Sequence, residues 1–131
     1  MAEKAAAERS LLEGESIRLT LDMPPSANRY WRSTGRVYVS ENAELYKADV
    51  STLAYQQGVR RELAGDLAMT VRVYRKIKSG DLDNRLKVLL DALKGVAFTD
   101  DKQIVEIHAY RFDDARNPRV EVEIEIVNRE S

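Results

Sequence analysis

The stretch MTVRVYRKIKSGDLDNRLKVLLDALKG, residues 69–95, places a strand and a helix next to each other. In residues 69–74 apolar and more polar side chains alternate, and a period of two predicts a strand with one buried face. Leucines at helical spacing follow in residues 86–93 and predict a helix with an apolar stripe, which Gly95 is placed to end. A basic run and a Ser-Gly turn connect the two elements.

The same alternation on either side of this stretch predicts the rest of the fold. Further strands are expected at residues 17–21, 37–39, 104–112 and 119–127, and a helix from a cap at Ser40 to about Leu63. Asn117-Pro118 predicts a hairpin between the last two strands. The fold class is α+β, with a mixed sheet of four to five strands and two main helices packed on it.

The chain length of 131 residues predicts one domain. Residues 1–16 are alanine-rich and are expected to form a flexible extension, while residues 17–131 form the folded domain. The absence of cysteine excludes disulfides, thiolate nucleophiles and cysteine-based zinc sites. No segment has the apolar length of a signal peptide or membrane span, so we expect a soluble, cytoplasmic protein with no membrane partner.

Charge is distributed unevenly, although the net charge is only −1. Residues 24–80 hold ten basic and five acidic side chains, for a net of +5, whereas residues 81–131 hold eight basic and twelve acidic ones, for a net of −4. A basic surface beside an acidic pocket suits a protein that cleaves a polyanion with the help of a metal ion.

Acidic side chains gather around the predicted strand-to-helix junction. The motif Asp81-Leu82-Asp83-Asn84 opens the helix, Lys87 and Asp91 follow on it, and Asp100-Asp101 comes after it. Carboxylates brought this close repel one another unless a cation or a shared proton neutralises them. Oxygen ligands without histidine or thiolate favour Mg²⁺, with Mn²⁺ as a substitute, over zinc. A metal-dependent nuclease is therefore expected, in which Lys87 stabilises negative charge on a phosphate.

Each of these residues also has a purely structural interpretation. Asp83 can be a helix cap, Asp83 and Lys87 can be an exposed ion pair one turn apart, and Asp100-Asp101 can be an ordinary turn. For any one of them alone the structural interpretation is favoured, and only their conjunction favours a metal site. His108 is expected to be a structural or surface residue of a strand.

Basic and aromatic residues alternate between the first strand and the first helix. Arginines can follow a nucleic-acid backbone while rings stack on bases, although the rings can equally pack on the domain itself. The candidate DNA contacts are Arg29, Tyr30, Arg32 and Arg36 in this segment, and Arg75, Lys76 and Lys78 in the basic run before Asp81.

Residues 17–126 resemble the RusA family of Holliday-junction resolvases. The resemblance rests on Pro24-Pro25-Ser26 and Asn28-Arg29-Tyr30 near the start, and on the block from Asp81 through Asp101. It implies that Asp81, Asp83 and Asp101 are the metal-binding catalytic carboxylates and that Lys87 is the catalytic cation. Asn84, Asp91 and Asp100 would support that site.

The resemblance further implies a homodimer that binds four-way junction DNA. Such an enzyme resolves the junction by paired symmetric nicks during recombination and repair, and its gene is often carried by a prophage. Two symmetric cuts require two active sites related by a two-fold axis, which a dimer supplies. Two alternatives stay open. One is a non-catalytic junction-binding protein, and the other is a broader structure-selective nuclease that acts on forks and flaps.

Overall fold

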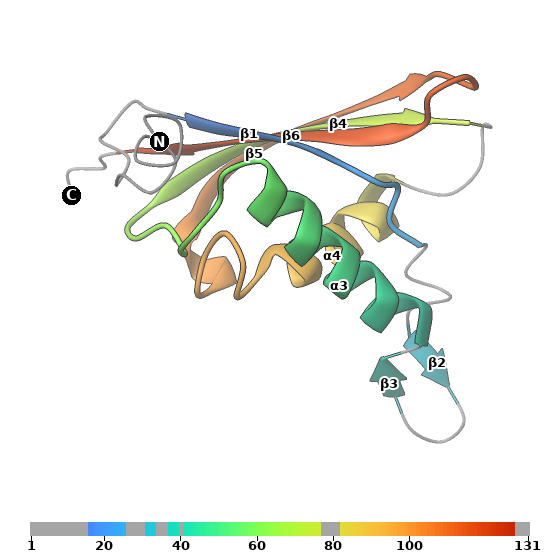
Figure 1. Ribbon diagram of the computed structural model, residues 1–131, viewed down its shortest axis with the longest axis horizontal. Coiled ribbons are helices and arrows are strands. Elements are labelled where there is room, and N and C mark those ends of the chain that lie inside the picture. The colour runs from blue at the N-terminus through green and yellow to red at the C-terminus, as the bar shows by residue number, and fades with distance from the viewer. Residues whose placement is uncertain (1–15, 26–30, 34–36, 40, 77–81, 128–131) are drawn as a thin grey trace.

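The computed structural model describes residues 16–25, 31–33, 37–39, 41–76 and 82–127. Its elements are shown in Figure 1. In chain order they are β1 (Ser16–Leu21), β2 (Trp31–Ser33), β3 (Val37–Val39), α3 (Glu41–Gln56), β4 (Leu67–Arg75), α4 (Leu82–Leu93), the 3-10 helix η1 (Asp101–Gln103), β5 (Ile104–Asp113) and β6 (Arg119–Ile126).

Four of the strands form one mixed sheet in the order β1-β6-β4-β5. Strand β6 pairs antiparallel with β1 and β4, whereas β5 pairs parallel with β4. Parallel neighbours need a crossover connection, and α4 supplies it. The mixed sheet with two helices confirms the predicted α+β fold class.

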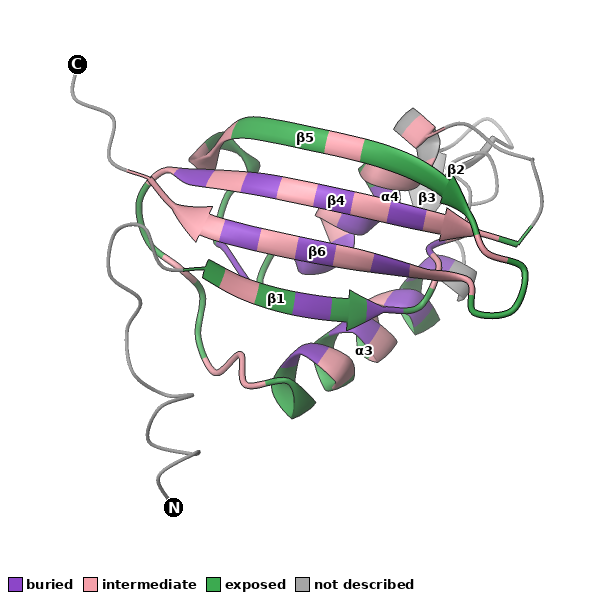
Figure 2. Cartoon of the chain, turned by 90° about the horizontal axis from the view of Figure 1, so that it is seen from above, coloured by how far each residue is buried: buried purple, intermediate pink, exposed green. Residues whose placement is uncertain are grey.

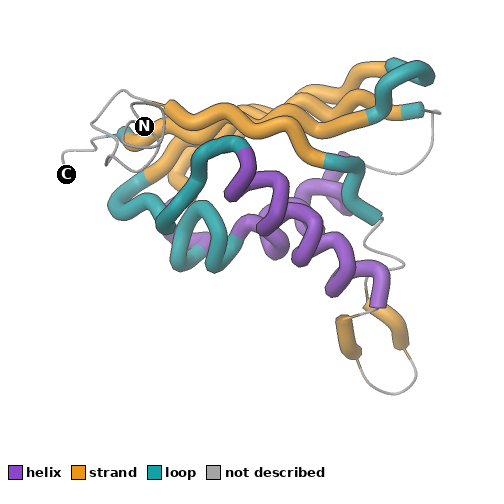
Figure 3. The backbone as a smooth tube through the Cα atoms, viewed as in Figure 1, coloured by secondary structure: helices purple, strands orange, loops and turns teal. Residues whose placement is uncertain are grey.

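Both helices cover the same face of this sheet, as Figures 1 and 3 show. Seen from above in Figure 2, β4 and β6 alternate between buried and partly exposed residues, as expected when one face packs on a core. The fully buried large side chains include residues from β1, β4, β6, α3 and α4 and the loop after α4: Leu19, Leu21, Leu67, Met69, Val71, Val73, Ile124, Val50, Leu89, Leu93 and Phe98. Burial of these side chains is the main stabilising contribution to the fold.

The predicted end of the first helix is wrong. Helix α3 ends at Gln56, not near Leu63, and the chain turns at Gly58, whose φ of 104° lies in the left-handed region. Glycine adopts this conformation without the steric cost that a β-carbon brings, so it stops the helix here. After this turn, Leu63 runs beside the segment that follows α4, and its N–H donates to Ala97 O at 2.7 Å.

The predicted hairpin between the last two strands is also wrong. Strand β4 lies between β5 and β6, so the two strands do not pair. The residues on the inward face of β6 are buried, as suits a central strand, whereas most of β5 is exposed, as suits an edge. The segment around Asn117 is a turn in which Asp114 accepts hydrogen bonds from the backbone N–H groups of Arg116 and Asn117, both at 3.2 Å.

The short strand predicted at Val37–Val39 is present as β3, and it pairs with β2 in a separate two-stranded sheet. Strand β2 belongs to the basic and aromatic segment and was not predicted. Within the described ranges, no helix combines the length and apolar character that crossing a membrane requires.

Candidate active site

The predicted catalytic motif lies where β4 ends and α4 begins. Asp81 is outside the described residues, while Asp83 and Asn84 belong to the first turn of α4 and their side chains are not described. The orientation of α4 is determined by its buried stripe, which includes Val88 and Leu89. Lys87 precedes this stripe, one turn after Asp83, and its side chain is exposed to solvent.

Asp91, a predicted supporting residue, faces the other helix. Its Oδ2 atom lies 3.3 Å from Lys47 Nζ on α3, and both side chains are roughly one third to two fifths exposed. An ion pair with this exposure stabilises a protein by about 0–1 kcal/mol. Asp91 therefore helps to hold α3 against α4, and its support of the catalytic site stays a prediction.

Asp100 caps the 3-10 helix η1. Its carboxylate accepts a hydrogen bond from the Lys102 N–H at 2.9 Å, and the Gln103 side chain accepts from the Asp100 N–H at 3.1 Å. This reciprocal arrangement is a capping box. The amide of Gln103 also donates to Leu63 O at 2.9 Å and to Gly65 O at 3.0 Å, which ties η1 to the segment before β4.

Asp101 is the first residue of η1 and is exposed. Because β4 and β5 are parallel, α4 must carry the chain back along the sheet from the end of β4 to the start of β5. Asp101 therefore lies beyond the end of α4 that is far from Asp83. Leu93, the last residue of α4, is ten positions after Asp83, and at a rise of 1.5 Å a residue the helix spans about 15 Å between them.

This geometry corrects one expectation from the sequence, that all the carboxylates gather at one strand-to-helix junction of a single chain. The crossover places Asp101 at the opposite end of α4 from Asp83. In the part of the chain that the structure describes, no group of three or more histidine, cysteine, aspartate or glutamate side chains is arranged to hold a metal ion.

The junction itself carries positive charge. Arg75, the last residue of β4, forms an ion pair with Asp113 at 2.9 Å and is only 11% exposed, while Lys76 follows it and is exposed. Of the other candidate DNA contacts, Arg29, Tyr30, Arg36 and Lys78 lie outside the described residues, and the side chain of Arg32 in β2 is not described.

Arg85, in the first turns of α4, was missed by sequence reasoning. Its Nη1 donates to Pro24 O at 2.6 Å, while its Nε is buried without a hydrogen-bond partner among the described residues. Burial, followed by repulsion from Arg75, lowers the pKa of Arg85 below its ordinary value. Two neighbouring guanidinium groups favour anionic groups beside them. The feature of the sequence that could have identified Arg85 is its position directly after Asn84, the last residue of the motif.

The profile of the family described as Endodeoxyribonuclease RusA matches residues 22–125. The chain belongs to this family. It is 34% identical over 107 residues to the crossover junction endodeoxyribonuclease rusA of Enterobacteria phage HK97, covering 76% of this chain and 78% of that protein. It is 30% identical over 109 residues to the protein of that name from Escherichia coli strain K12, covering 81% and 91%. A relative from Enterobacteria phage 82 is 28% identical over 114 residues, covering 83% and 93%.

Membership of the RusA family confirms the resemblance and the class of function that the sequence predicted, an endodeoxyribonuclease. The matched region begins at Asp22, just after β1, and ends at Glu125 in β6, so it includes both helices and the whole crossover from β4 to β5. The identities of the individual site residues stay predictions.

A second acidic pair of this RusA-family domain lies apart from the motif, between the end of β1 and α3. The hydrogen bond that the protonated Asp49 donates to Asp22, followed by burial, raises the pKa of Asp49 to about 6. The Tyr46 hydroxyl donates to Asp22 O at 2.9 Å, and burial raises the pKa of Tyr46 above its usual range. Together these contacts attach α3 to the segment that follows β1.

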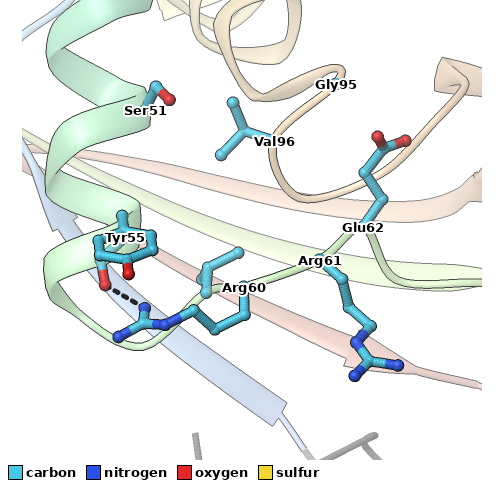
Figure 4. Close-up of a pocket in the computed structure, with 8 residues that line it drawn as sticks. Ser51, Tyr55, Arg60, Arg61, Glu62, Gly95 and Val96 are labelled. Atoms are coloured by element: carbon cyan, nitrogen blue, oxygen red, sulfur yellow. Dashed lines mark hydrogen bonds between the residues drawn. The ribbon is translucent and has the colours of Figure 1, made fainter. Parts of the chain in front are cut away.

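A shallow pocket lies between the end of α3 and the loop after α4 (Figure 4). The Arg60 guanidinium stacks over the Tyr55 ring at 3.8 Å and donates a hydrogen bond to Tyr55 O. Glu62, the one carboxylate of the lining, accepts a hydrogen bond from the Thr99 hydroxyl at 2.6 Å. The pocket is therefore not suited to hold a metal ion. Its lining residues are Ser51, Tyr55, Val59, Arg60, Arg61, Glu62, Gly95 and Val96.

Proposed function

We propose that this chain is a magnesium-dependent endodeoxyribonuclease that resolves four-way DNA junctions by paired symmetric nicks. Family membership supports the nuclease class, and the names of the relatives from phage HK97 and Escherichia coli K12 support junction DNA as the substrate. The acidic motif beside basic side chains supports cleavage of a polyanion with the help of a cation.

In this proposal Asp81, Asp83 and Asp101 hold the cation. An oxygen-only set of carboxylates fits Mg²⁺ and Mn²⁺, which are hard ions, better than zinc. When bound, the cation supplies an activated water and offsets charge on the phosphate. Lys87 is exposed on the same helix as Asp83, where its ammonium group can reach a phosphate oxygen and stabilise the charge that develops there.

The separation of Asp83 from Asp101 carries the next step of the proposal. Asp83 and Asp101 lie at opposite ends of α4 in one chain, so in this proposal a site that uses both combines Asp83 of one copy with Asp101 of another. A two-fold axis that makes this contact once also makes it a second time. Two identical active sites result, and they match the paired nicks that resolution of a junction requires.

DNA is held in this proposal by the basic residues that flank the motif. Lys76 is exposed just before it, and the arginines at positions 29, 32 and 36 precede the first helix. Contacts of this kind go mainly to phosphates and position the substrate without reading its sequence. Arg75 is already bound to Asp113, so it orders the junction end of β4 and would reach DNA only by giving up this ion pair.

The decisive experiment mixes two inactive variants. Asp83→Asn and Asp101→Asn are each expected to bind a labelled four-way junction but lose magnesium-dependent nicking. If the site is shared, a mixed dimer has one site with both carboxylates intact, so mixing the variants restores nicking of one strand of the junction. If each site belonged to one chain, no intact site would form in the mixture and no activity would return.

Glu44→Gln is the matched control for these variants, because Glu44 is exposed on α3 and its change also converts a carboxylate to an amide. It is expected to retain nicking. Undiminished nicking by Asp83→Asn would refute the assignment of the cation site. Cleavage of fork, flap and duplex DNA of matching sequence tests the substrate preference. Equal cleavage rates on these substrates and on the four-way junction would show a broader nuclease and not a resolvase.

A further inference from the structure

The pocket between the end of α3 and the loop after α4, here called the Arg60 pocket, is lined by more positive than negative charge. Arg60 and Arg61 belong to its lining, and Glu62 is its one carboxylate. Its volume is about 220 Å³, below the roughly 300–1,000 Å³ of sites that enclose a drug-sized ligand. The pocket therefore suits a small anionic group better than a whole cofactor.

The Arg60 guanidinium is held in place but has no counter-charge nearby. It stacks on the Tyr55 ring, with Cζ 3.8 Å from the ring centroid, and its Nη1 donates to Tyr55 O. Its Nε is buried without a hydrogen-bond partner. Among the described residues no carboxylate forms an ion pair with Arg60. An ordered cation with an unpaired donor favours a ligand whose oxygens can accept from it.

The single carboxylate of the pocket is bound to another group. Glu62 Oε2 accepts a hydrogen bond from the Thr99 hydroxyl at 2.6 Å. Figure 4 shows this carboxylate on the side away from the Arg60 guanidinium, which lies beside the Tyr55 ring. Glu62 therefore does not neutralise Arg60, and the positive charge stays available to an anion.

The chemistry of the lining favours a phosphate that is attached to a sugar. A guanidinium offers parallel N–H groups that match the oxygens of a phosphate. Ser51 adds a hydroxyl that can donate to the same group, while Val59 and Val96 supply apolar surface. This combination of donors, positive charge and apolar wall fits the backbone of a nucleic acid.

The pocket also lies at the end of α4 where the chain continues to Asp101. Thr99, which binds Glu62, is two residues before Asp101. The Leu63 N–H donates to Ala97 O at 2.7 Å, so the segment of the two arginines runs beside the loop that leads to η1. A phosphate in the Arg60 pocket would therefore lie on the Asp101 side of the domain.

We propose that the Arg60 pocket binds a backbone phosphate of the substrate DNA outside the cleavage site. This inference rests on the proposed function, because that function brings a DNA strand to Asp101. A contact of this kind positions the strand without reading its sequence. It stabilises bound substrate and transition state equally, so it lowers the half-saturating DNA concentration and leaves the nicking rate at saturation unchanged.

The test measures affinity for a four-way junction over a range of salt concentrations, in calcium to prevent cleavage. Arg60→Gln and Arg61→Gln should each reduce the slope of log affinity against log salt by about 1, since each removes a cation that displaces counterions from a phosphate. At about 0.1 M salt the affinity should fall by about fivefold to tenfold. Arg18→Gln is the matched control, because Arg18 is 83% exposed on β1 and pairs with Glu123. It should retain both values.

A variant of opposite sign guards against an effect of damaged folding. Glu62→Gln removes the negative charge of the pocket, while its amide oxygen can still accept from the Thr99 hydroxyl. It should bind the junction more tightly than the natural chain, and a damaged fold does not produce a gain. Glu123→Gln on β6 is the control for this change and should leave the affinity unaltered.

A second source of the same chemistry is free phosphate. Calorimetric titration with inorganic phosphate tests it directly. If Arg60→Gln and Arg61→Gln abolish phosphate binding but leave junction affinity unchanged, the pocket takes a free phosphate and the DNA contact is refuted.

The remaining outcomes separate this inference from the proposed function. If both arginine variants unfold like the natural chain and bind the junction with unaltered affinity and salt slope, the pocket proposal is overturned, and nicking by the natural chain leaves the function standing. If Arg60→Gln loses its fold, Arg61→Gln and Glu62→Gln decide the matter. The expected changes in affinity in a chain that never nicks a junction support the pocket and refute the proposed function.

Discussion

Arg75 and Asp113 are register partners at the ends of β4 and β5, and their side chains form an ion pair of 2.9 Å between Nε and Oδ1. The guanidinium is only 11% exposed, whereas the carboxylate is about half exposed. Asp113 thus balances the positive charge of Arg75 at the strand end beside the catalytic motif. The like charge of Arg85 lies near Arg75.

Replacing Asp113 with asparagine is expected to lower the free energy of unfolding by about 1–2 kcal/mol, because it leaves a largely buried cation without its counter-charge. Urea denaturation measures the change. Glu123→Gln is the control, since its ion pair with Arg18 at 3.1 Å involves an arginine that is 83% exposed, and its loss should change stability little. Equal effects of the two substitutions would contradict the role given to burial.

The Asp22–Asp49 pair predicts a pH dependence of stability. The pKa of Asp49 rises from its ordinary value of 3.8 to about 6 in the folded protein. Between these values the folded state binds more protons, so the contribution of this pair is complete below pH 3.8 and is lost as the pH rises through about 6. The stability of Asp49→Asn, whose amide can still donate to Asp22, should lack this dependence.

The measurement is the difference in unfolding free energy between Asp49→Asn and the natural chain as a function of pH. The variant is expected to gain stability relative to the natural chain as the pH rises from about 3.8 to about 6, and to keep this gain at higher pH. A difference that stays constant over this interval would show that the two carboxylates do not share a proton. Glu44→Gln, on an exposed part of α3, should give such a constant difference.

Periodic burial explains which parts of the fold could be predicted. Strands β4 and β6 alternate because one face packs on the core, and α4 follows from its leucine stripe. The end of α3 was misplaced because the apolar residues after Gly58 continue the pattern, although that glycine turns the chain. Alternation identifies a strand but not its neighbour, so the insertion of β4 between β5 and β6 could not be predicted from it.

In the candidate site too, the residue types could be predicted from the sequence, but their positions in space could not. The aspartates and Lys87 could be singled out from their chemistry, and their roles in the site stay predictions. Their distribution in space depends on the parallel pairing of β4 with β5, which sends Asp101 to the far end of α4. Arg85 was overlooked because its significance comes from Pro24 and Arg75, which are distant in sequence.

Gln103 is expected to position Asp101 through its side-chain hydrogen bonds. Its amide donates to Leu63 O and Gly65 O and accepts from the N–H groups of Thr99 and Asp100. Gln103→Ala removes these contacts and should lower the unfolding free energy by about 1–3 kcal/mol, because it leaves backbone groups unpaired.

Junction nicking by Gln103→Ala should fall by more than the loss of folded protein accounts for, since η1 no longer holds Asp101 in place. Gln56→Ala is the control, because Gln56 is an exposed glutamine at the end of α3. Raising the magnesium concentration should recover part of the nicking if the cation site is merely loosened. If a Gln103→Ala variant has lost stability but nicks at the full rate, η1 does not contribute to catalysis through the hydrogen bonds of Gln103.

Lys87 offers the clearest distinction between binding and chemistry. Its side chain is exposed on α4, so Lys87→Ala should leave the unfolding free energy within about 0.5 kcal/mol of its natural value. If the ammonium stabilises charge that develops on the phosphate, the substitution should reduce single-turnover nicking of a four-way junction by about 10²–10³-fold. Affinity for the junction, measured in calcium to prevent cleavage, should change far less.

Lys94→Ala is the matched control for Lys87, because Lys94 is an exposed lysine just after the end of the same helix. It should nick at the natural rate. If Lys87→Ala loses as much junction affinity as nicking rate, Lys87 is a DNA contact that stabilises the bound substrate and the transition state equally. A loss confined to the rate would instead identify it as a group that acts on the transition state, since uniform binding does not alter the chemical step.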